Sequence, residues 1–158
     1  FHGVGTNAKM SEFHAAMGLC NLNHIDEILA KRKAICEAYD ASLFNNNTSS
    51  SPPQCPAKPE AKHGSSIVYR EGATRNFAYY PVIFESEQFL LAAMQSLSDA
   101  GIVARRYFYP DLSECFGVEL DACSRSLDVS KRILCLPLSV SLSLEQARLI
   151  ADKLTLAI

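Results

Sequence analysis

The sequence lacks long hydrophobic runs, a strong net charge and the common short catalytic motifs. Its longest purely apolar stretches are short, such as residues 89–94, whereas a membrane-spanning helix needs roughly 18 residues. The 15 basic and 17 acidic side chains leave a net charge of −2, so no basic footprint for nucleic acid exists. The motifs G-x-S-x-G, H-E-x-x-H, G-x-G-x-x-G and the P-loop are absent. We therefore expect no membrane partner, no nucleic-acid partner and no catalytic residue that pattern alone could name.

The six cysteines form no C-x-x-C pair, and no cysteine–histidine cluster has the spacing of zinc ligands. We therefore expect no metal site. An even number of cysteines allows a disulfide framework, but no secretory signal opens the chain. Cys20 and Cys36 also lie among apolar residues with helical spacing. We expect reduced, mostly buried thiols and a cytoplasmic location.

What is present indicates a globular fold of about one domain, with 158 residues of which 48% are apolar and 20% charged. Ser11 is a candidate N-cap for a first helix, with Ala15, Ala16 and Leu19 behind it. A longer helix is expected over residues 24–43, and its basic residues 31–33 are expected to form a solvated face rather than a binding patch. Residues 45–66 are rich in Asn, Ser and Pro and predict a flexible loop.

The second half predicts strands alternating with helices. Strands are expected over residues 77–84, 102–108 and 133–138, with an irregular stretch at 109–128. Ser86 and Ser143 are expected to cap two helices, with Gly101 ending the first of them. The expected inward residues of these two helices are Phe89, Leu90, Met94, Leu97 and Ala100, then Leu144, Ala147, Ile150, Ala151 and Leu154. The order predicts an α+β fold with a helical segment at 1–44, a flexible loop at 45–66 and a small α+β domain at 67–158.

Two polar clusters could bind a ligand. Residues 3–12 form a Gly- and Asn-rich turn that runs into a helix start, where backbone N–H groups can hold a phosphate; a plain helix-entry loop is the alternative. Residues 105–110, RRYFYP, bring two guanidinium groups and two phenols to the end of an expected strand. Such a set suits an anion and a sugar. Alternation along a strand would place Arg105, Tyr107 and Tyr109 on one face and Arg106 on the other.

These clusters also carry a family resemblance. Residues 5–19, GTNAKMSEFHAAMGL, resemble the signature G-x-N-x-R/K-M-S/T-E-x-x-A-A-x-G-L of the DegT/DnrJ/EryC1/StrS aminotransferases. Residues 105–110 and 130–138, SKRILCLPL, are similar to segments of the subgroup that makes 3- or 4-amino-dideoxyhexoses on dTDP. These enzymes use pyridoxal phosphate (PLP) and act on nucleotide-linked keto-sugars. The resemblance implies the C-terminal domain of a fold-type I aminotransferase, with N-terminal helices and a small, mostly antiparallel sheet.

The resemblance also implies roles for individual residues. Asn7 matches the asparagine that reaches the PLP phosphate of the partner subunit in a homodimer or larger assembly, and Lys9 lies in the same loop. Arg105, Arg106, Tyr107 and Tyr109 fall where this domain lines the nucleotide-sugar cleft. The segment with the Schiff-base lysine would precede Phe1, so the resemblance implies PLP in the parent enzyme but no covalently bound PLP and no catalytic residue in this chain.

Two hypotheses follow from this partial match. In the first, the chain is the C-terminal portion of a nucleotide-sugar aminotransferase. That enzyme would transfer an amino group from an amino acid such as glutamate, and the chain alone would be inactive. In the second, the chain is a free-standing fragment that acts as a non-catalytic binding or interaction module.

Overall fold

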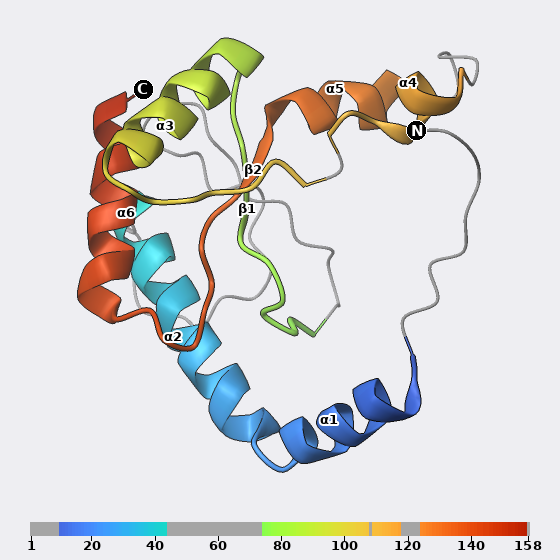
Figure 1. Ribbon diagram of the computed structural model, residues 1–158. Coiled ribbons are helices and arrows are strands. Elements are labelled where there is room, and N and C mark those ends of the chain that lie inside the picture. Colours follow the sequence, from blue (N-terminus) through green and yellow to red (C-terminus); the bar gives the residue numbers. More distant parts are fainter. Residues whose placement is uncertain (1–9, 44–73, 108, 118–123, 158) are drawn as a thin grey trace.

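A computed structural model describes residues 10–43, 74–107, 109–117 and 124–157. Within them the elements are α1 (Glu12–Leu22), α2 (Ile25–Leu43), β1 (Pro81–Ile83), α3 (Glu87–Asp99), α4 (Leu112–Phe116), α5 (Ser124–Arg132), β2 (Ile133–Cys135) and α6 (Leu144–Ala157). Helices α2, α3 and α6 lie together on one side of the strands, α5 and α4 extend on the other, and α1 projects from one end of α2 (Figure 1). The chain has the expected α+β class, with helices around a small antiparallel sheet.

The sheet is held by backbone pairing between β1 and β2, with Val82 opposite Leu134. Pro81 lies opposite Cys135, whose N–H and C=O both bond to Arg105 on its other side, at 2.8 and 3.1 Å. The missing N–H of Pro81 therefore removes no ladder bond, which explains how a proline is tolerated in the strand.

The expected strands at 77–84 and 102–108 are mostly not formed. Phe77 has a φ of 49°, and the Asn76 side chain accepts a hydrogen bond from the N–H of Ala78, so the chain turns before β1 begins. Among residues 102–107 of the second segment, which the structure describes, only Arg105 pairs with the sheet, and Tyr107 lies in a turn. The third expected strand is confirmed over its first half as β2.

Capping residues set the helix ends. Ser11 and Ser86 accept hydrogen bonds from the N–H groups of His14 and Phe89, and Gly101 follows α3 with a φ of 72°. Ser143 and Gln146 cap α6 reciprocally: each side-chain oxygen accepts from the other residue's N–H, at 3.1 and 2.9 Å. The predictions for these caps are confirmed.

The stretch expected to be irregular holds two helices. Asp111 accepts from the N–H of Ser113 as the N-cap of α4, and Gly117 ends this helix with a φ of 64°. Helix α5 begins at Ser124 and leads directly into β2. An Asp–Gly pair six residues apart was the local signal for α4, but a helix of this length makes too few periodic contacts for apolar spacing to indicate it.

The core lies between the sheet and helices α2, α3 and α6. Its largest fully buried side chains are Tyr39, Tyr80, Phe84, Ile35, Leu90, Leu97, Leu134 and Leu154. Ala147 and Ala151 are also fully buried, which brings α6 close to the helices beside it.

Some residues expected to face inward do not. Phe89, Ala100 and Leu144 are exposed, and Ala93 rather than Phe89 fills the inner face of α3 beside Leu90. The basic residues 31–33 were expected to form a solvated face, but Arg32 is half-buried while Lys31 and Lys33 are exposed. The expected loop at 45–66 lies outside the described residues.

Helix α1 buries none of its residues. Met10, just before it, and Phe13, Met17 and Leu22 on it are all more than half exposed, and Leu19, expected to pack inward, is too. The described residues therefore supply no cover for this helix. Cys20, expected to be buried, is exposed on α1, whereas Cys36 is buried on α2 as expected.

Candidate functional site

The backbone of Arg105 is fixed next to the sheet by its two hydrogen bonds with Cys135. Its side chain is exposed, and Nη1 donates to the hydroxyl of Tyr107 at 3.4 Å. The Tyr107 ring meets the Tyr79 ring edge to face, with centroids 4.9 Å apart. Arg105 makes no ion pair within 4.0 Å among the described residues. One guanidinium group and two phenol rings therefore form a single cluster.

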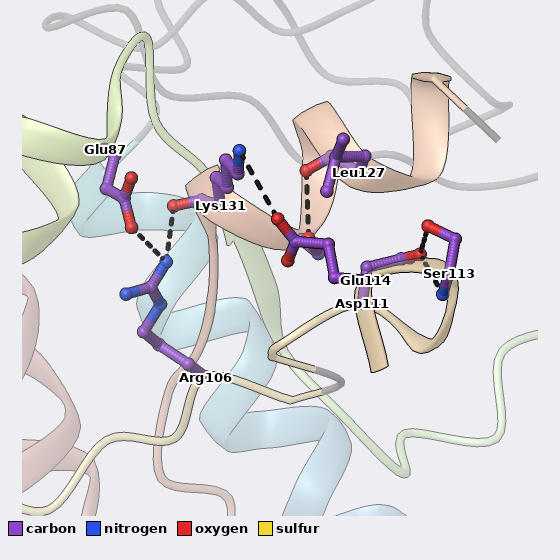
Figure 2. Close-up of polar contacts among 8 residues, drawn as sticks. Glu87, Arg106, Asp111, Ser113, Glu114, Leu127 and Lys131 are labelled. Carbon is purple, nitrogen blue, oxygen red and sulfur yellow. Dashed lines mark hydrogen bonds and ion pairs between the residues drawn. The ribbon is translucent and has the colours of Figure 1, made fainter. Parts of the chain in front are cut away.

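Arg106 lies in a separate cluster. Its Nη2 donates to Glu87 Oε1 at 2.7 Å and to the backbone carbonyl of Lys131 at 2.9 Å, as Figure 2 shows. Its guanidinium carbon lies 3.5 Å from the centre of the Tyr109 ring, a cation–π contact. Tyr109 therefore associates with Arg106 and not, as strand alternation predicted, with Arg105 and Tyr107. The turn at Tyr107 ends the alternation and causes this difference.

Arg106 is paired through Nη2, whereas its Nε is buried without a hydrogen-bond partner among the described residues. The Arg106 guanidinium beside Glu87 holds the pKa of that carboxyl below its usual value. By bonding the Lys131 carbonyl, Arg106 also satisfies an acceptor in the last turn of α5, where a cation suits the helix dipole. The ammonium of Lys131 pairs with Glu114 of α4 at 3.7 Å (Figure 2). Helices α3, α5 and α4 are thus linked through two basic side chains.

A pocket of about 330 Å³ lies beside the first cluster. Part of its lining comes from the sheet and α5, through Pro81, Val129, Ser130, Ile133 and Cys135. Burial raises the pKa of the Cys135 thiol to about 11, so this side chain is an uncharged wall at neutral pH.

The rest of the lining comes from Tyr79, Tyr107, Asp111 and Ser126. Hydrogen bonds from Ser113 hold the pKa of Asp111 below its usual value, so it is ionised at neutral pH. Of the four predicted substrate residues, Tyr107 lines this pocket directly, and Arg105 donates a hydrogen bond to the Tyr107 hydroxyl. Asp111 and the α5 residues were missed because α4 and α5 were not expected.

A second polar network ties α2 to the sheet. The Tyr80 hydroxyl donates to Asp40 Oδ1 at 2.6 Å, Arg75 lies 3.7 Å from Oδ2, and the Tyr39 hydroxyl donates to the carbonyl of Pro137. Burial raises the pKa of Asp40 in spite of both partners. Sequence spacing gave no signal for this network, because Tyr80 and Asp40 are 40 residues apart.

The residues expected to contact PLP, Asn7 and Lys9, lie outside the described residues. An internal aldimine needs a desolvated lysine with positioned partners. None of the four described lysines is buried; Lys31, Lys33 and Lys131 pair with carboxylates at 2.7–3.9 Å, and Lys153 is half-exposed on α6. The described residues therefore do not fit the cofactor.

Comparison with solved structures places the fold among sugar aminotransferases. The protein Spr1654 of Streptococcus pneumoniae, assigned as a sugar aminotransferase, superimposes in its PMP form with a TM-score of 0.71, at 19% identity over 94% of this chain and 35% of its own. A protein of Bacillus cereus, assigned as a PLP-dependent aminotransferase, has a TM-score of 0.65 at 25% identity, over 98% of this chain and 39% of its own.

The pattern of the DegT/DnrJ/EryC1/StrS aminotransferase family matches residues 1–155, and the chain belongs to this family. Two curated relatives are named dTDP-4-amino-4,6-dideoxy-D-glucose transaminase. The protein of Shigella dysenteriae is 33% identical over 148 residues and that of Escherichia coli 29% identical over 150 residues. Each match covers 89% of this chain but 36% of the relative, so the chain spans about a third of their length.

Two kinds of site are absent from the described residues. Within them no helix combines the length and the apolar character that crossing a bilayer demands. Nor do three or more His, Cys, Asp or Glu side chains gather there in a group that could hold a metal ion.

Proposed function

We propose that this chain is the C-terminal portion of a PLP-dependent aminotransferase that transfers an amino group, from an amino acid such as glutamate, to a nucleotide-linked keto-deoxysugar. The observation that carries the proposal is the 33% identity, over 89% of the chain, to a transaminase named for a dTDP-linked aminosugar. A cytoplasmic location, inferred from the cysteine pattern, is part of the same proposal.

In this proposal the two arginine–tyrosine clusters serve the sugar nucleotide in different ways. Arg105 is exposed and its guanidinium is tethered by Tyr107 beside a pocket, so both are placed to contact the substrate. Arg106 and Tyr109 stack on each other, and Arg106 is bonded to Glu87 and α5. We assign to them the positioning of the segment that carries Arg105 and Tyr107.

The proposal leaves the covalent chemistry to residues outside this chain. Asn7 and Lys9 would contact the PLP phosphate of a partner subunit, and the chain alone would be inactive. PLP, when bound in the complete enzyme, supplies the electron sink for amino transfer. The residues of this chain would bind and orient the sugar nucleotide beside it.

A chimera tests the proposal. The part of the Escherichia coli relative that matches this chain is replaced by residues 1–158, and transamination is measured with the aminosugar nucleotide for which that enzyme is named and 2-oxoglutarate. We expect activity together with the aldimine absorbance band. Asn7→Ala should weaken PLP retention, whereas Asn21→Ala, a change of the same type on exposed α1, should leave it unchanged. A chimera that folds and binds PLP but transfers no amino group would count against the proposal.

The 158-residue chain provides the matching negative experiment. After incubation with PLP and borohydride reduction, we expect the intact mass to show only scattered, substoichiometric lysine adducts, because no described lysine is desolvated. A single stoichiometric adduct at one lysine would show that the chain holds the cofactor by itself.

A further inference from the structure

The turn that precedes β1 contains a strained residue. Phe77 has a φ of 49°, a conformation that a bulky side chain keeps only where its surroundings enforce it. Within the turn, the Asn76 side chain accepts a hydrogen bond from the N–H of Ala78 at 3.1 Å. A single hydrogen bond between exposed partners is a weak restraint. Other contacts must therefore hold the backbone at Phe77.

Asp40, in the last turn of α2, holds the strained turn at both ends. Its Oδ1 accepts a hydrogen bond from the Tyr80 hydroxyl at 2.6 Å, and its Oδ2 lies 3.7 Å from Nη1 of Arg75. The Arg75 guanidinium carbon also lies 5.0 Å from the centre of the Phe77 ring. One carboxylate therefore fixes the residue two positions before Phe77 and the residue three positions after it.

The stability of α2 does not account for a carboxylate at position 40. A negative charge in the last turn of a helix meets the negative end of the helix dipole. Burial also raises the pKa of Asp40 in spite of its two partners. Because both effects act against the charged group, we interpret Asp40 by the geometry that it imposes.

Tyr79 lies inside the turn that Asp40 holds. Its side chain is 53% exposed, and its ring meets the Tyr107 ring edge to face, with centroids 4.9 Å apart. The Tyr107 hydroxyl in turn accepts a hydrogen bond from Arg105. A ring that is more than half exposed has little packing to fix its direction, so the backbone of the turn sets where the Tyr79 ring lies.

We propose that Asp40 is a positioning residue for the aminotransferase reaction: by holding both ends of the strained turn, it sets the Tyr79 ring against Tyr107. The inference rests on the proposed function for the reaction and on the contacts of Asp40 for the positioning. Asp40 itself touches neither substrate nor cofactor in this role. The alternative is that packing of Tyr80 and Phe77 in the core shapes the turn, and that Asp40 only satisfies the Tyr80 hydroxyl.

The contact between the two rings can be measured in the 158-residue protein as the nuclear Overhauser effect (NOE) between Tyr79 and Tyr107. Arg75→Gln frees one end of the turn and Tyr80→Phe frees the other, and neither leaves a buried hydroxyl without an acceptor. We expect each variant to lose part of the NOE and the double variant to lose most of it. Asp40→Asn keeps an acceptor for Tyr80 but removes the charge that pairs with Arg75, so it should match Arg75→Gln.

Two controls change the same kinds of group without changing a bond to Asp40. Lys33→Gln removes an exposed ion pair of α2, in which Lys33 Nζ lies 3.9 Å from Glu37 Oε1. Tyr39→Phe removes the hydroxyl of an equally buried tyrosine, which donates to the Pro137 carbonyl at 2.9 Å. Both variants should keep the NOE, because both ends of the turn stay bonded.

Rescue by a conservative change gives a further readout. Arg75→Lys keeps a cation and should recover part of the NOE that Arg75→Gln loses. The proposal is overturned if the NOE survives Arg75→Gln combined with Tyr80→Phe, because packing alone then shapes the turn. It is also overturned if Tyr39→Phe weakens the NOE as much as Tyr80→Phe does. If the double variant does not fold, single variants that match their controls overturn the proposal in the same way.

The chimera connects the positioning to the reaction. Arg75→Gln should raise its KM for the aminosugar nucleotide roughly threefold to tenfold and leave kcat and the aldimine band unchanged, whereas Lys33→Gln should change none of them. If the chimera transaminates and Arg75→Gln keeps the parent KM, the positioning role is wrong while the function stands. If the chimera folds, binds PLP and transfers no amino group, the function is wrong, and the NOE comparison alone decides whether Asp40 sets the two rings.

Discussion

At the residue scale, Asp40 combines burial with two partners, and burial has the larger effect on its pKa. Whether Asp40 raises or lowers the free energy of unfolding depends on which state, folded or unfolded, loses the Asp40 proton first as the pH rises. Well below the usual aspartate pKa of about 3.9 both states are protonated, so Asp40 contributes no pH dependence there. As the pH rises, the unfolded chain releases the proton first, and this group lowers the free energy of unfolding.

Asp40→Asn should therefore change how stability varies with pH. The amide oxygen still accepts from the Tyr80 hydroxyl, 2.6 Å from Oδ1 in the parent, but the side chain no longer ionises. Measured by urea unfolding, the midpoint of the variant relative to the parent should rise between about pH 3 and pH 7. Asp152→Asn, at an exposed position of α6, is the matched control and should follow the parent. Parallel curves for Asp40→Asn and the parent would contradict the role assigned to burial.

Individual contacts were the hardest feature to predict. Residues 105–110 stood out by composition, but their grouping depended on the turn at Tyr107, which no pattern marked. The buried position of Cys36 followed from helical spacing, whereas the same reasoning failed for Cys20 because the described chain buries no residue of α1. Spacing identifies an apolar face, and only tertiary packing decides whether that face is covered.

At the scale of elements, the long helices were predictable because their capping residues and the spacing of their apolar residues indicate the same helix. The extended segments were predictable only in part, because β propensity is satisfied only where a partner strand exists. Residues 77–80 and 102–104 have strand-like composition, yet the turn at Phe77 and the single bridge at Arg105 leave them outside the sheet. Pairing between β1 and β2 joins residues about 50 positions apart, which no local signal specifies.

Helix α3 offers a matched pair of leucines for testing the packing. Leu97 is fully buried against the other core residues, whereas Leu91 on the same helix is 50% exposed. Leu97→Ala should lower the free energy of unfolding by about 2–5 kcal/mol, because it removes buried surface and leaves a cavity. Leu91→Ala should cost well under half as much, since alanine suits a helix and little surface is lost. Urea unfolding measures both, and equal losses would show that the inner face of α3 is wrongly assigned.

At the scale of the whole molecule, α1 is the part that the rest of the described chain does not stabilise. Phe13 and Met17 are four residues apart on one face of this helix and are 85% and 64% exposed. An apolar face of this kind is typical of an interface. Together with the family's homodimer, which the sequence resemblance implies, it supports our proposal that the protein is a dimer or larger, joined mainly through residues 1–44.

The variant Phe13→Glu/Met17→Glu should therefore dissociate the protein. In sedimentation equilibrium at about 30 μM, a concentration in the range of weak dissociation constants, the parent should be a dimer or larger and the variant a monomer. Leu149→Glu, which places the same charge on a 52% exposed leucine of α6, should leave the assembly intact. A monomeric parent would refute the proposal, and a dimer that survives both glutamates would place the contact elsewhere.

The Arg106 guanidinium has a consequence for the lifetime of the folded state. It joins Glu87 at the start of α3 to Lys131 at the end of α5, partners 19 and 25 residues away in the sequence. Both bonds join helices that must first reach their final places, and we therefore expect them to form after the folding transition state. Interactions that are absent from the transition state slow unfolding while leaving the folding rate almost unchanged. We therefore expect Arg106 to slow unfolding and so to keep the segment that carries Arg105 and Tyr107 in place between rare openings.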